Sequence, residues 1–340
     1  MSVYASQIHH LLAGAALDAP TTEALMGEVL DGALEATQVA AVLTALAAKG
    51  VTAPELAGCA AAMRARLRPV RASGPVLDTC GTGGSRLPTM NTSTLAAFVV
   101  ASDGVRVAKH GNRKSSGKCG SLDVLEHLGV QVALEPEQAE RLLEQGPFVF
   151  LDARRHHPAL GPLGPVRRAL GFPTVFNLLG PICNPAGATR QVLGVSDRER
   201  APLMAQALLE LGTERALVVS GADRLDEISL CGPTTVHELD GSGEIRARTI
   251  DARTFGLAQH SFEAIAGGEL EENTRRFMEV LSGRDRGPRH LHTAVNAGAA
   301  LFVAGRADDL RAGFERASAL LERGAPAETF ARYREASHAV

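Results

Sequence analysis

From residue 76 onward the sequence alternates between short apolar runs and amphipathic segments, and this alternation restricts the fold more than any other feature. Strands are predicted near residues 76–79, 105–109, 131–134, 147–151, 190–195 and 215–220. Helices are predicted near residues 92–102, 121–128, 136–145 and 198–211, and again near 268–282 and 290–335. Such alternation is typical of a largely parallel sheet covered on both faces. Residues 238–244 join two alternating segments in the manner of a hairpin, so we expect the sheet to be mixed.

Two further regions predict helices only. In residues 1–70, a capping box at Thr52 begins one helix and Gly50 ends the helix before it. Residues 160–187 are again helical, so we expect them to return to this helical lobe. A chain of 340 residues also exceeds the size at which single cores usually stop growing. The predicted class is therefore α/β, with a small all-helical lobe (1–70, joined by about 160–187) and a large α/β lobe (74–159 and 188–340) that has a mixed, mostly parallel central sheet.

Composition argues against several classes of protein. The net charge of −3 and the pI near 6.4 give no overall attraction for nucleic acid or an anionic membrane. The five cysteines are far apart and have no CxxC spacing, which indicates reduced thiols and neither a disulfide framework nor a zinc site. No stretch of 18 or more apolar residues occurs, and the N-terminus lacks a basic segment followed by an apolar run. We therefore expect a cytoplasmic protein with no nucleic-acid or membrane partner.

The most unusual polar stretch is Lys109–Ser121, Lys-His-Gly-Asn-Arg-Lys-Ser-Ser-Gly-Lys-Cys-Gly-Ser. It contains three of the four lysines of the chain, interleaved with glycines and serines. A compact ammonium group meets a phosphate oxygen as a point charge, while glycines and hydroxyl groups let backbone N–H groups close on the same anion. We interpret the stretch as an anion cradle; the alternative is a solvated basic loop.

A glycine cluster, Gly81-Thr-Gly-Gly-Ser85, directly follows the first predicted strand, and Asn91-Thr-Ser-Thr94 stands at the start of the next helix. Glycines let the backbone approach a phosphate, and a helix N-terminus offers unpaired N–H groups. The spacing matches neither a P-loop nor a dinucleotide-binding fingerprint. Taken alone, the cluster also fits a tight strand-to-helix turn with an ordinary N-cap.

An acidic pair, Asp226-Glu227, lies just past the predicted strand at 215–220, at the edge where open α/β sheets bind ligands. Magnesium is commonly held by one or two carboxylates together with substrate phosphates and water, so the pair is a candidate magnesium site; the alternative is a surface acidic pair. Arg167 offers a planar fork for a carboxylate, whereas Arg168 is expected to be a solvated helix residue. Four histidines lack metal-binding spacing and are expected to be structural or loop residues: His156, His157, His290 and His292.

Several motifs, in the same order over most of the chain, resemble the anthranilate phosphoribosyltransferase family of tryptophan biosynthesis. They are Gly81–Gly84, Asn91–Thr94, Lys109–Ser121 with Asp123–Glu126, His157–Ala159, Pro165–Arg167, Phe176–Pro181 with Asn184-Pro185, and Leu225–Ser229. The resemblance implies a helical lobe plus an α/β lobe, a homodimer and Mg²⁺. It also implies transfer of the phosphoribosyl group from phosphoribosyl pyrophosphate, the donor, to the amino group of anthranilate, the acceptor, with release of pyrophosphate.

The resemblance also implies roles for individual residues. It implies that the donor is bound by Gly81, Gly84, Ser85, Thr89, Asn91, Thr92, Ser93, Thr94, Lys109, His110, Gly111, Asn112, Arg113, Lys114, Ser115, Ser116, Gly117 and Ser121. It implies that the acceptor is bound by Gly81, His110, Asn112, Arg167 and Pro181, and that magnesium is bound by Ser93, Asp226 and Glu227.

The sequence departs from the family pattern at four places. The family usually has Asp where this chain has Ser85, Ala-Val at Lys114-Ser115, Ser-Ser at Ser116-Gly117, and Arg at Pro173. The change at Ser85 bears on how magnesium near the pyrophosphate is held. Lys114 adds a positive charge where the family has an apolar residue, which would tighten the hold on the polyphosphate.

No Ser-His-Asp order, activated cysteine or isolated general base stands out, so we expect no discrete catalytic acid, base or nucleophile. Catalysis would then consist of positioning and electrostatic stabilisation of the leaving group. One alternative is a pyrimidine nucleoside phosphorylase of the same fold, which should have a different glycine loop and no Arg167. Another is a non-catalytic nucleic-acid-binding relative, which should have lost Asp226-Glu227 and gained a basic surface.

Overall fold

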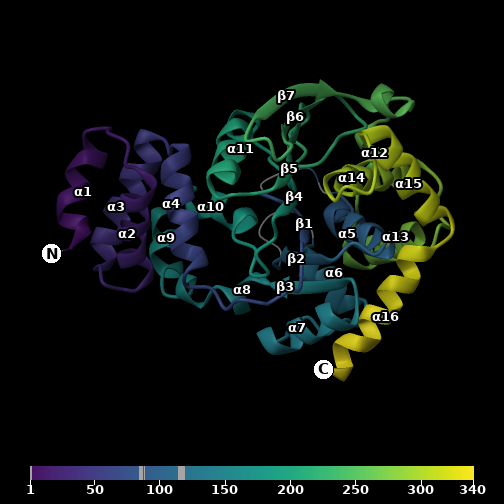
Figure 1. Cartoon of the computed structure of the whole chain (residues 1–340), viewed down its shortest axis with the longest axis horizontal. Helices are drawn as coiled ribbons and strands as arrows, with labels where there is room; N and C mark the ends of the chain where they lie inside the picture. Colours follow the sequence, from purple (N-terminus) through teal and green to yellow (C-terminus); the bar gives the residue numbers. More distant parts are fainter. Residues whose placement is uncertain (1, 84–86, 88, 114–118) are drawn as a thin grey trace.

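The computed structural model describes residues 2–83, 87, 89–113 and 119–340. Six of the predicted donor-binding residues lie outside this described part: Gly84, Ser85, Lys114, Ser115, Ser116 and Gly117. The chain forms a helical lobe that carries the N-terminus and a larger lobe built around one sheet (Figure 1). The predicted α/β class with a separate helical lobe is confirmed.

The sheet of the large lobe has seven strands in the order β3-β2-β1-β4-β5-β6-β7. The first five strands pair in parallel and the last two are antiparallel, so the predicted mixed, mostly parallel sheet is confirmed. The predicted hairpin is the β6–β7 connection. The bounds are β1 Leu77–Gly81, β2 Val107–Gly111, β3 Phe148–Asp152, β4 Arg190–Gly194, β5 Arg215–Gly221, β6 Thr234–Leu239 and β7 Ile245–Ile250.

The strand predicted at 131–134 is wrong. This segment is extended coil outside the sheet, although its alternating residues Val132 and Leu134 are buried in the apolar core. The Gln131 amide donates its hydrogen bond to the Ser337 hydroxyl, 3.0 Å away, rather than to a neighbouring strand. The alternation of apolar and polar residues here therefore reflects burial against the rest of the lobe rather than pairing with another strand.

Helices cover both faces of the sheet, and each face has its own apolar core. On one face, α5 (Thr92–Ser102) is almost wholly buried and packs against α14 and α16. On the other face, α11 (Ala201–Glu210) packs against β5 and against α4 of the helical lobe. The remaining helices of this lobe are α6 Ser121–His127, α7 Pro136–Gln145, α8 Ala153–His156, α12 Phe262–Ile265, α13 Leu270–Leu281, α14 Pro288–Val303, α15 Leu310–Glu322 and α16 Ala325–Ala339.

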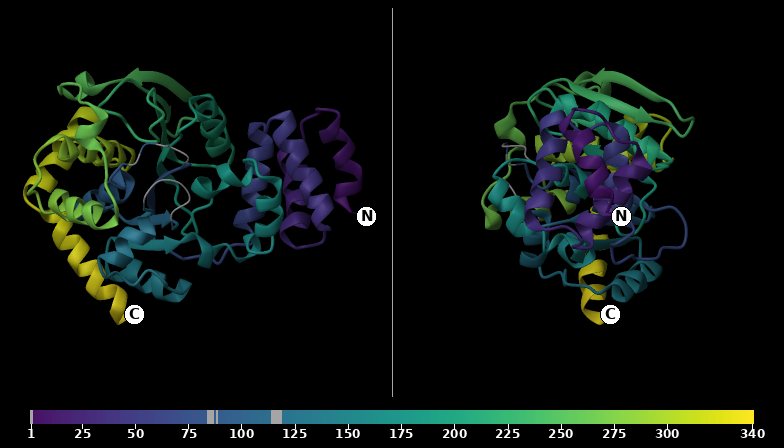
Figure 2. Two further views of the ribbon diagram at one scale, coloured as in Figure 1. Left: turned by 180° about the vertical axis from the view of Figure 1, so that it is seen from behind. Right: turned by 90° about the vertical axis from the view of Figure 1, so that its left-hand side faces the viewer.

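The helical lobe consists of α1 (Val3–Leu12), α2 (Ala19–Leu30), α3 (Ala36–Lys49) and α4 (Ala53–Arg64), together with two short helices from later in the chain. These are α9 (Gly164–Leu170), which packs against α3, and α10 (Phe176–Leu179), which packs against α4. Figure 2 shows this lobe as a separate layer at the end of the molecule that carries the N-terminus. None of the helices in the described part of the chain is both long and apolar enough to span a membrane.

A buried ion pair stabilises the helical lobe at the α3–α4 junction. Gly50 ends α3 with a positive φ of 85°, and Thr52 begins α4 through a capping box with Glu55, as predicted. The Glu55 carboxylate is fully buried and accepts hydrogen bonds from the Leu17 amide, the Thr52 amide and hydroxyl, and the Lys49 ammonium at 2.7 Å. Every oxygen of this carboxylate is therefore paired within the lobe.

Candidate active site

A cavity of about 370 Å³ opens where the carboxyl ends of the parallel strands face the returning helices α9 and α10. Its walls come from the loop after β1, the end of β2, the starts of α6 and α8, the α9–α10 segment, and the loop after β5. The predicted residues that line it are Gly81, Asn91, Ser93, Lys109, His110, Gly111, Asn112, Arg113, Ser121, Arg167, Pro181 and Asp226. The structure therefore brings most of the described candidates to one place.

The loop after β1 needs its glycines because the loop after β5 packs directly against it. A Cβ atom on Gly81 would lie 2.5 Å from Asp226 Oδ2, and the backbone of Asp226 leaves no room for a Cβ on Gly194. The Gly83 amide donates a hydrogen bond to the same Asp226 carboxylate at 3.1 Å. Glycine in this loop therefore serves close packing against an acidic residue, besides leaving backbone N–H groups near the cavity.

The start of α5 presents polar groups to the cavity. Asn91 stands at the N-cap position with a positive φ of 57°, an uncommon conformation for a residue other than glycine. Asn91 and Ser93 line the cavity, whereas Thr92 and Thr94 are buried behind it. The Thr79 hydroxyl donates to the Ser93 carbonyl at 2.7 Å and fixes this turn to β1.

Lys109 and His110, at the end of β2, lie on the cavity wall but are buried. The Lys109 ammonium donates to the Thr79 carbonyl at 2.7 Å, and burial lowers the pKa of this lysine while Asp78 opposes the shift. The His110 Nδ1 lies 3.2 Å from the Gly180 carbonyl, and burial holds the pKa of the imidazole well below its usual value. Lys109 therefore braces β1 from inside the wall, and His110 is neutral.

A buried carboxylate that sequence reasoning missed lies beneath these residues. Asp78 accepts hydrogen bonds from Asn184 Nδ2 at 2.8 Å and from the His110 amide at 3.3 Å, and burial raises its pKa. Asn184 also donates to the Ala108 carbonyl at 2.8 Å. The group thus links β1 and β2 to the point where the chain returns from the helical lobe. An aspartate within the apolar strand Val76-Leu-Asp-Thr79 was the available signal.

Arg167 of α9 is the basic residue of the opposite wall. Its guanidinium lies 5.3 Å from the centroid of the Phe176 ring, and burial lowers its pKa. Among the residues that the structure describes, no carboxylate pairs with it. A half-buried guanidinium with an aromatic neighbour and no counter-ion suits a planar aromatic carboxylate.

Arg113 differs from Arg167, because two carboxylates of α6 already hold it. Its guanidinium lies 3.1 Å from Asp123 Oδ1 and 2.8 Å from Glu126 Oε2, at the surface of the protein. Its neighbour Asn112 uses its side-chain oxygen to accept a hydrogen bond from the Arg113 amide. Arg113 is therefore a weaker candidate for a donor contact than its place in the basic stretch suggested.

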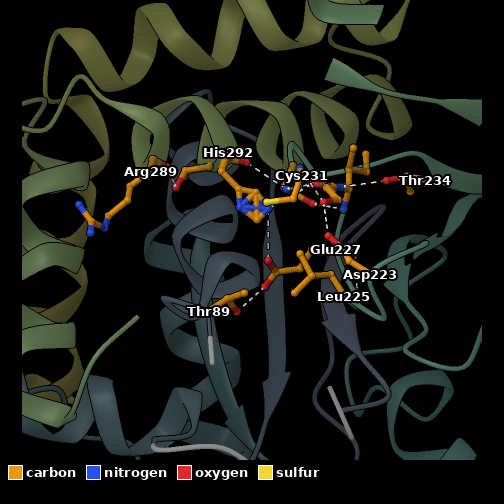
Figure 3. A network of polar contacts seen from close by, with 12 residues as sticks. Thr89, Asp223, Leu225, Glu227, Cys231, Thr234, Arg289 and His292 are labelled. Atoms are coloured by element: carbon orange, nitrogen blue, oxygen red, sulfur yellow. Dashed lines mark hydrogen bonds and ion pairs between the residues drawn. The ribbon is translucent and has the colours of Figure 1, made fainter. Parts of the chain in front are cut away.

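Asp226 and Glu227 lie in the loop after β5, beside the first turn of α5. Figure 3 shows that Thr89 and His292 approach the Glu227 carboxylate from two sides: the Thr89 hydroxyl donates to Oε1 at 2.9 Å, and His292 Nε2 lies 3.4 Å from Oε2 without a hydrogen bond. Burial and the nearby Asp226 raise the pKa of Glu227 to about 8. Burial lowers the pKa of His292 to about 4, so this imidazole is neutral and does not balance the carboxylate.

Residues of α14 hold this acidic loop in place, and sequence reasoning missed them. The Asn296 side chain accepts a hydrogen bond from the Ile228 amide at 2.9 Å and donates to the Ile228 carbonyl at 3.0 Å. His292 was expected to be structural, yet it lies beside Glu227. The signal was the spacing of His292 and Asn296, which are four residues apart and therefore lie on the same face of this helix. His156 and His290 instead contact the Arg68 carbonyl and Ser318.

The acidic pair fits an open magnesium site. Glu227 Oε2 is buried without a hydrogen-bond partner and Asp226 is buried with a raised pKa, and neither carboxylate pairs with a lysine or arginine in the part of the chain that the structure describes. In the described part of the chain, no group of three or more His, Cys, Asp or Glu side chains forms a closed metal centre. Magnesium usually keeps waters and binds one or two carboxylates plus substrate phosphates, so two carboxylates are enough for the protein's share of such a site.

Comparisons with known proteins agree with this geometry. Residues 73–327 match the family model described as "Glycosyl transferase family, a/b domain", and residues 6–67 match "Glycosyl transferase family, helical bundle domain". The chain is 44% identical over 321 residues to an anthranilate phosphoribosyltransferase of Rubrobacter xylanophilus, covering 94% of each chain. It is 46% identical over 319 residues to that of Roseiflexus castenholzii, again covering 94% of each.

Solved structures are similar over the whole length. The anthranilate phosphoribosyltransferase of Thermus thermophilus has a TM-score of 0.92 and 39% identity, covering 99% of this chain and 100% of that one. The Saccharomyces cerevisiae enzyme, solved in complex with PRPP and Mg, has a TM-score of 0.89 and 27% identity, covering 99% and 98%. The two-lobed fold, the carboxylate pair and these similarities together show that the chain belongs to the anthranilate phosphoribosyltransferase family.

Proposed function

We propose that this protein transfers the phosphoribosyl group of phosphoribosyl pyrophosphate to the amino group of anthranilate and releases pyrophosphate, as a step of tryptophan biosynthesis. One observation carries the proposal. Among the described residues, Asp226 lines one wall of the cavity, next to the buried Glu227, and neither carboxylate has a lysine or arginine partner, while the Arg167 guanidinium on the opposite wall has no carboxylate partner. A magnesium-bound polyphosphate supplies the cation for the carboxylates, and an aromatic carboxylate supplies the anion for the guanidinium.

The donor occupies the sheet side of the cavity. Backbone N–H groups of the Gly81–Gly83 turn and of the first turn of α5 approach its phosphates, and Asn91 and Ser93 supply side-chain contacts. Asp226 and Glu227, with Ser93, would hold magnesium. When bound, the metal neutralises the charge that develops on the departing pyrophosphate.

The acceptor occupies the side formed by α9 and α10. Arg167 pairs with the carboxylate of anthranilate, and Pro181 bounds the ring. His110 is neutral and lines the cavity on this side, where it packs against the acceptor. Asn112 lies next to it on the same wall. These contacts aim the amino nitrogen at the anomeric carbon, which lowers the entropic part of the barrier.

The resemblance further supports a homodimer and a cytoplasmic location, and we include both in the proposal. A pyrimidine nucleoside phosphorylase is less well supported, because Arg167 has an aromatic neighbour and faces the acceptor side of the cavity. A non-catalytic nucleic-acid binder is less well supported, because the acidic pair is retained at the cavity.

The loss of anthranilate fluorescence in the presence of phosphoribosyl pyrophosphate tests the proposal. We expect consumption with Mg²⁺ and little after chelation of divalent ions. A protein that binds both substrates but consumes no anthranilate with any divalent ion would contradict the proposed activity.

A further inference from the structure

Helix α13 reaches both loops that form the donor side of the cavity. It packs against α5, which begins after the first loop, and against α6, which begins after the second (Figure 1). The segment just before α13 also contacts the first loop, since Ala266 forms an isolated β-bridge with Thr89. Nothing in the sequence motifs pointed to this helix.

Asn273, on the first turn of α13, is the residue that makes the connection. Its side chain is completely buried. Nδ2 donates to Asn91 Oδ1 at 2.6 Å and lies 3.0 Å from the Cys119 sulfur. Asn91 in turn donates from its own Nδ2 to the Cys119 carbonyl at 3.3 Å. The three side chains therefore form one cluster that joins the start of α5 to the chain just before α6.

The surrounding backbone is shaped to admit the Asn273 amide. A Cβ atom on Gly267 would lie 2.9 Å from Asn273 Oδ1 and 2.5 Å from the Thr89 carbonyl, so only glycine leaves room for the amide there. Asn91 has a positive φ of 57°, a conformation that costs free energy and is kept only where surrounding contacts offset that cost. The hydrogen bond from Asn273 holds the Asn91 side-chain oxygen from the side away from the cavity.

We propose that Asn273 is a positioning residue for the donor. It holds Asn91 in its left-handed conformation and sets the separation between the start of α5 and the start of α6, the helices that follow the two loops on the donor side. The proposal rests on the proposed function, because it assigns the cavity side formed by these loops to phosphoribosyl pyrophosphate. Asn273 is fully buried and does not line the cavity, so it acts through Asn91 and Cys119 rather than by touching substrate.

The test compares Asn273→Ala and Asn273→Asp with Thr274→Val, a matched control on the same helix turn. Thr274 is buried too, but among the described residues its hydroxyl bonds only to the Leu270 and Glu271 carbonyls of α13 itself. Both Asn273 variants should raise the KM for phosphoribosyl pyrophosphate about tenfold and leave the KM for anthranilate within about twofold, because one donor-side hydrogen-bond cluster is lost. Thr274→Val should lower the Tm without separating the two KM values.

A double variant distinguishes positioning from general stability. If Asn273 acts through Asn91, then Asn91→Ala/Asn273→Ala should have a donor KM close to that of Asn91→Ala alone. Fully additive effects would overturn the proposal, as would equal changes in both KM values, or a lowered Tm with an unchanged donor KM.

Calorimetric binding of phosphoribosyl pyrophosphate with Mg²⁺ measures donor affinity without turnover. Failure of the wild type to consume anthranilate would thus reject the proposed function while leaving the role of Asn273 measurable.

Discussion

Glu55 and Glu227 are both buried glutamates, yet their surroundings are opposite. Glu55, in the helical lobe, has a lysine at 2.7 Å and accepts three further hydrogen bonds, from the Leu17 amide and from the amide and hydroxyl of Thr52. Glu227, at the sheet edge, has one hydroxyl donor, a neutral histidine and an acidic neighbour. A carboxylate paired by its own chain stabilises the fold, whereas one left short of positive charge is available to a ligand.

The largest expected effect comes from neutralising the incompletely paired carboxylates. Asp226→Asn/Glu227→Gln keeps the shape of both side chains but removes the charge that would hold magnesium. We expect kcat to fall by roughly a thousandfold, about 4 kcal/mol, because charge stabilisation of the leaving group is lost. Far-ultraviolet circular dichroism should be unchanged. Wild-type turnover with wild-type metal dependence would show that the metal assignment is wrong.

The matching change in the helical lobe should act on stability instead. Glu55→Gln leaves the buried Lys49 ammonium without its counter-ion, which should lower the free energy of unfolding by about 3 kcal/mol. Urea titration measures this loss, and turnover per folded molecule should remain near that of the wild type. A selective loss of turnover in Glu55→Gln, with stability retained, would break the comparison.

A similar contrast holds for two arginines. Arg66 pairs with Asp31 at 2.6 Å, whereas Arg167 has no carboxylate among the described residues. Arg167→Ala should raise the KM for anthranilate about thirtyfold, which corresponds to a loss of about 2 kcal/mol of binding free energy, because a charge-assisted pair with the acceptor is lost. The donor KM should change little. Arg66→Ala is the control and should leave both KM values unchanged. Equal effects of Arg167→Ala on both substrates would count against its acceptor role.

The smallest expected effect is a pH dependence of the metal-free protein. The pKa of Glu227 is raised to about 8 in the folded protein from 4.5, so the folded state binds more protons between these values than the unfolded chain. Stability should therefore fall as the pH rises through this range, by about 1 kcal/mol per pH unit. Urea titrations of the wild type and Glu227→Gln at pH 6 and pH 7, with chelator, should show that the variant lacks this component. If the free energy of unfolding changed equally between pH 6 and pH 7 in the wild type and the variant, the raised pKa would be contradicted.

The sequence predicted the parts of this account that depend on local pattern. The position of Asp226-Glu227 after an apolar strand located the acidic loop, and Thr52 located the start of α4. The basic stretch was predicted less well, because the partners of Lys109 and Arg113 come from the tertiary structure. Lys109 donates to the Thr79 carbonyl, and Arg113 pairs with carboxylates on α6.

Residues that act from behind the cavity could not be predicted. Asn273 and Asn296 lie more than 65 residues after the groups they hold, and the pairing of Glu55 with Lys49 depends on how α3 and α4 meet. The polar side chains of these residues were visible in the sequence, but their partners were not. The false strand at 131–134 has the same cause, since alternation reports which residues are buried and not what covers them.

The most direct test is the change in Tm when Mg²⁺ and phosphoribosyl pyrophosphate are added together. If Asp226 and Glu227 form a ligand site while Glu55 only stabilises the fold, both ligands should raise the Tm of the wild type and of Glu55→Gln by similar amounts. Asp226→Asn/Glu227→Gln should show little or no Mg²⁺-dependent increase. An undiminished Mg²⁺-dependent increase in the double variant would contradict the account, because the incompletely paired carboxylates would then not be the site of the cation.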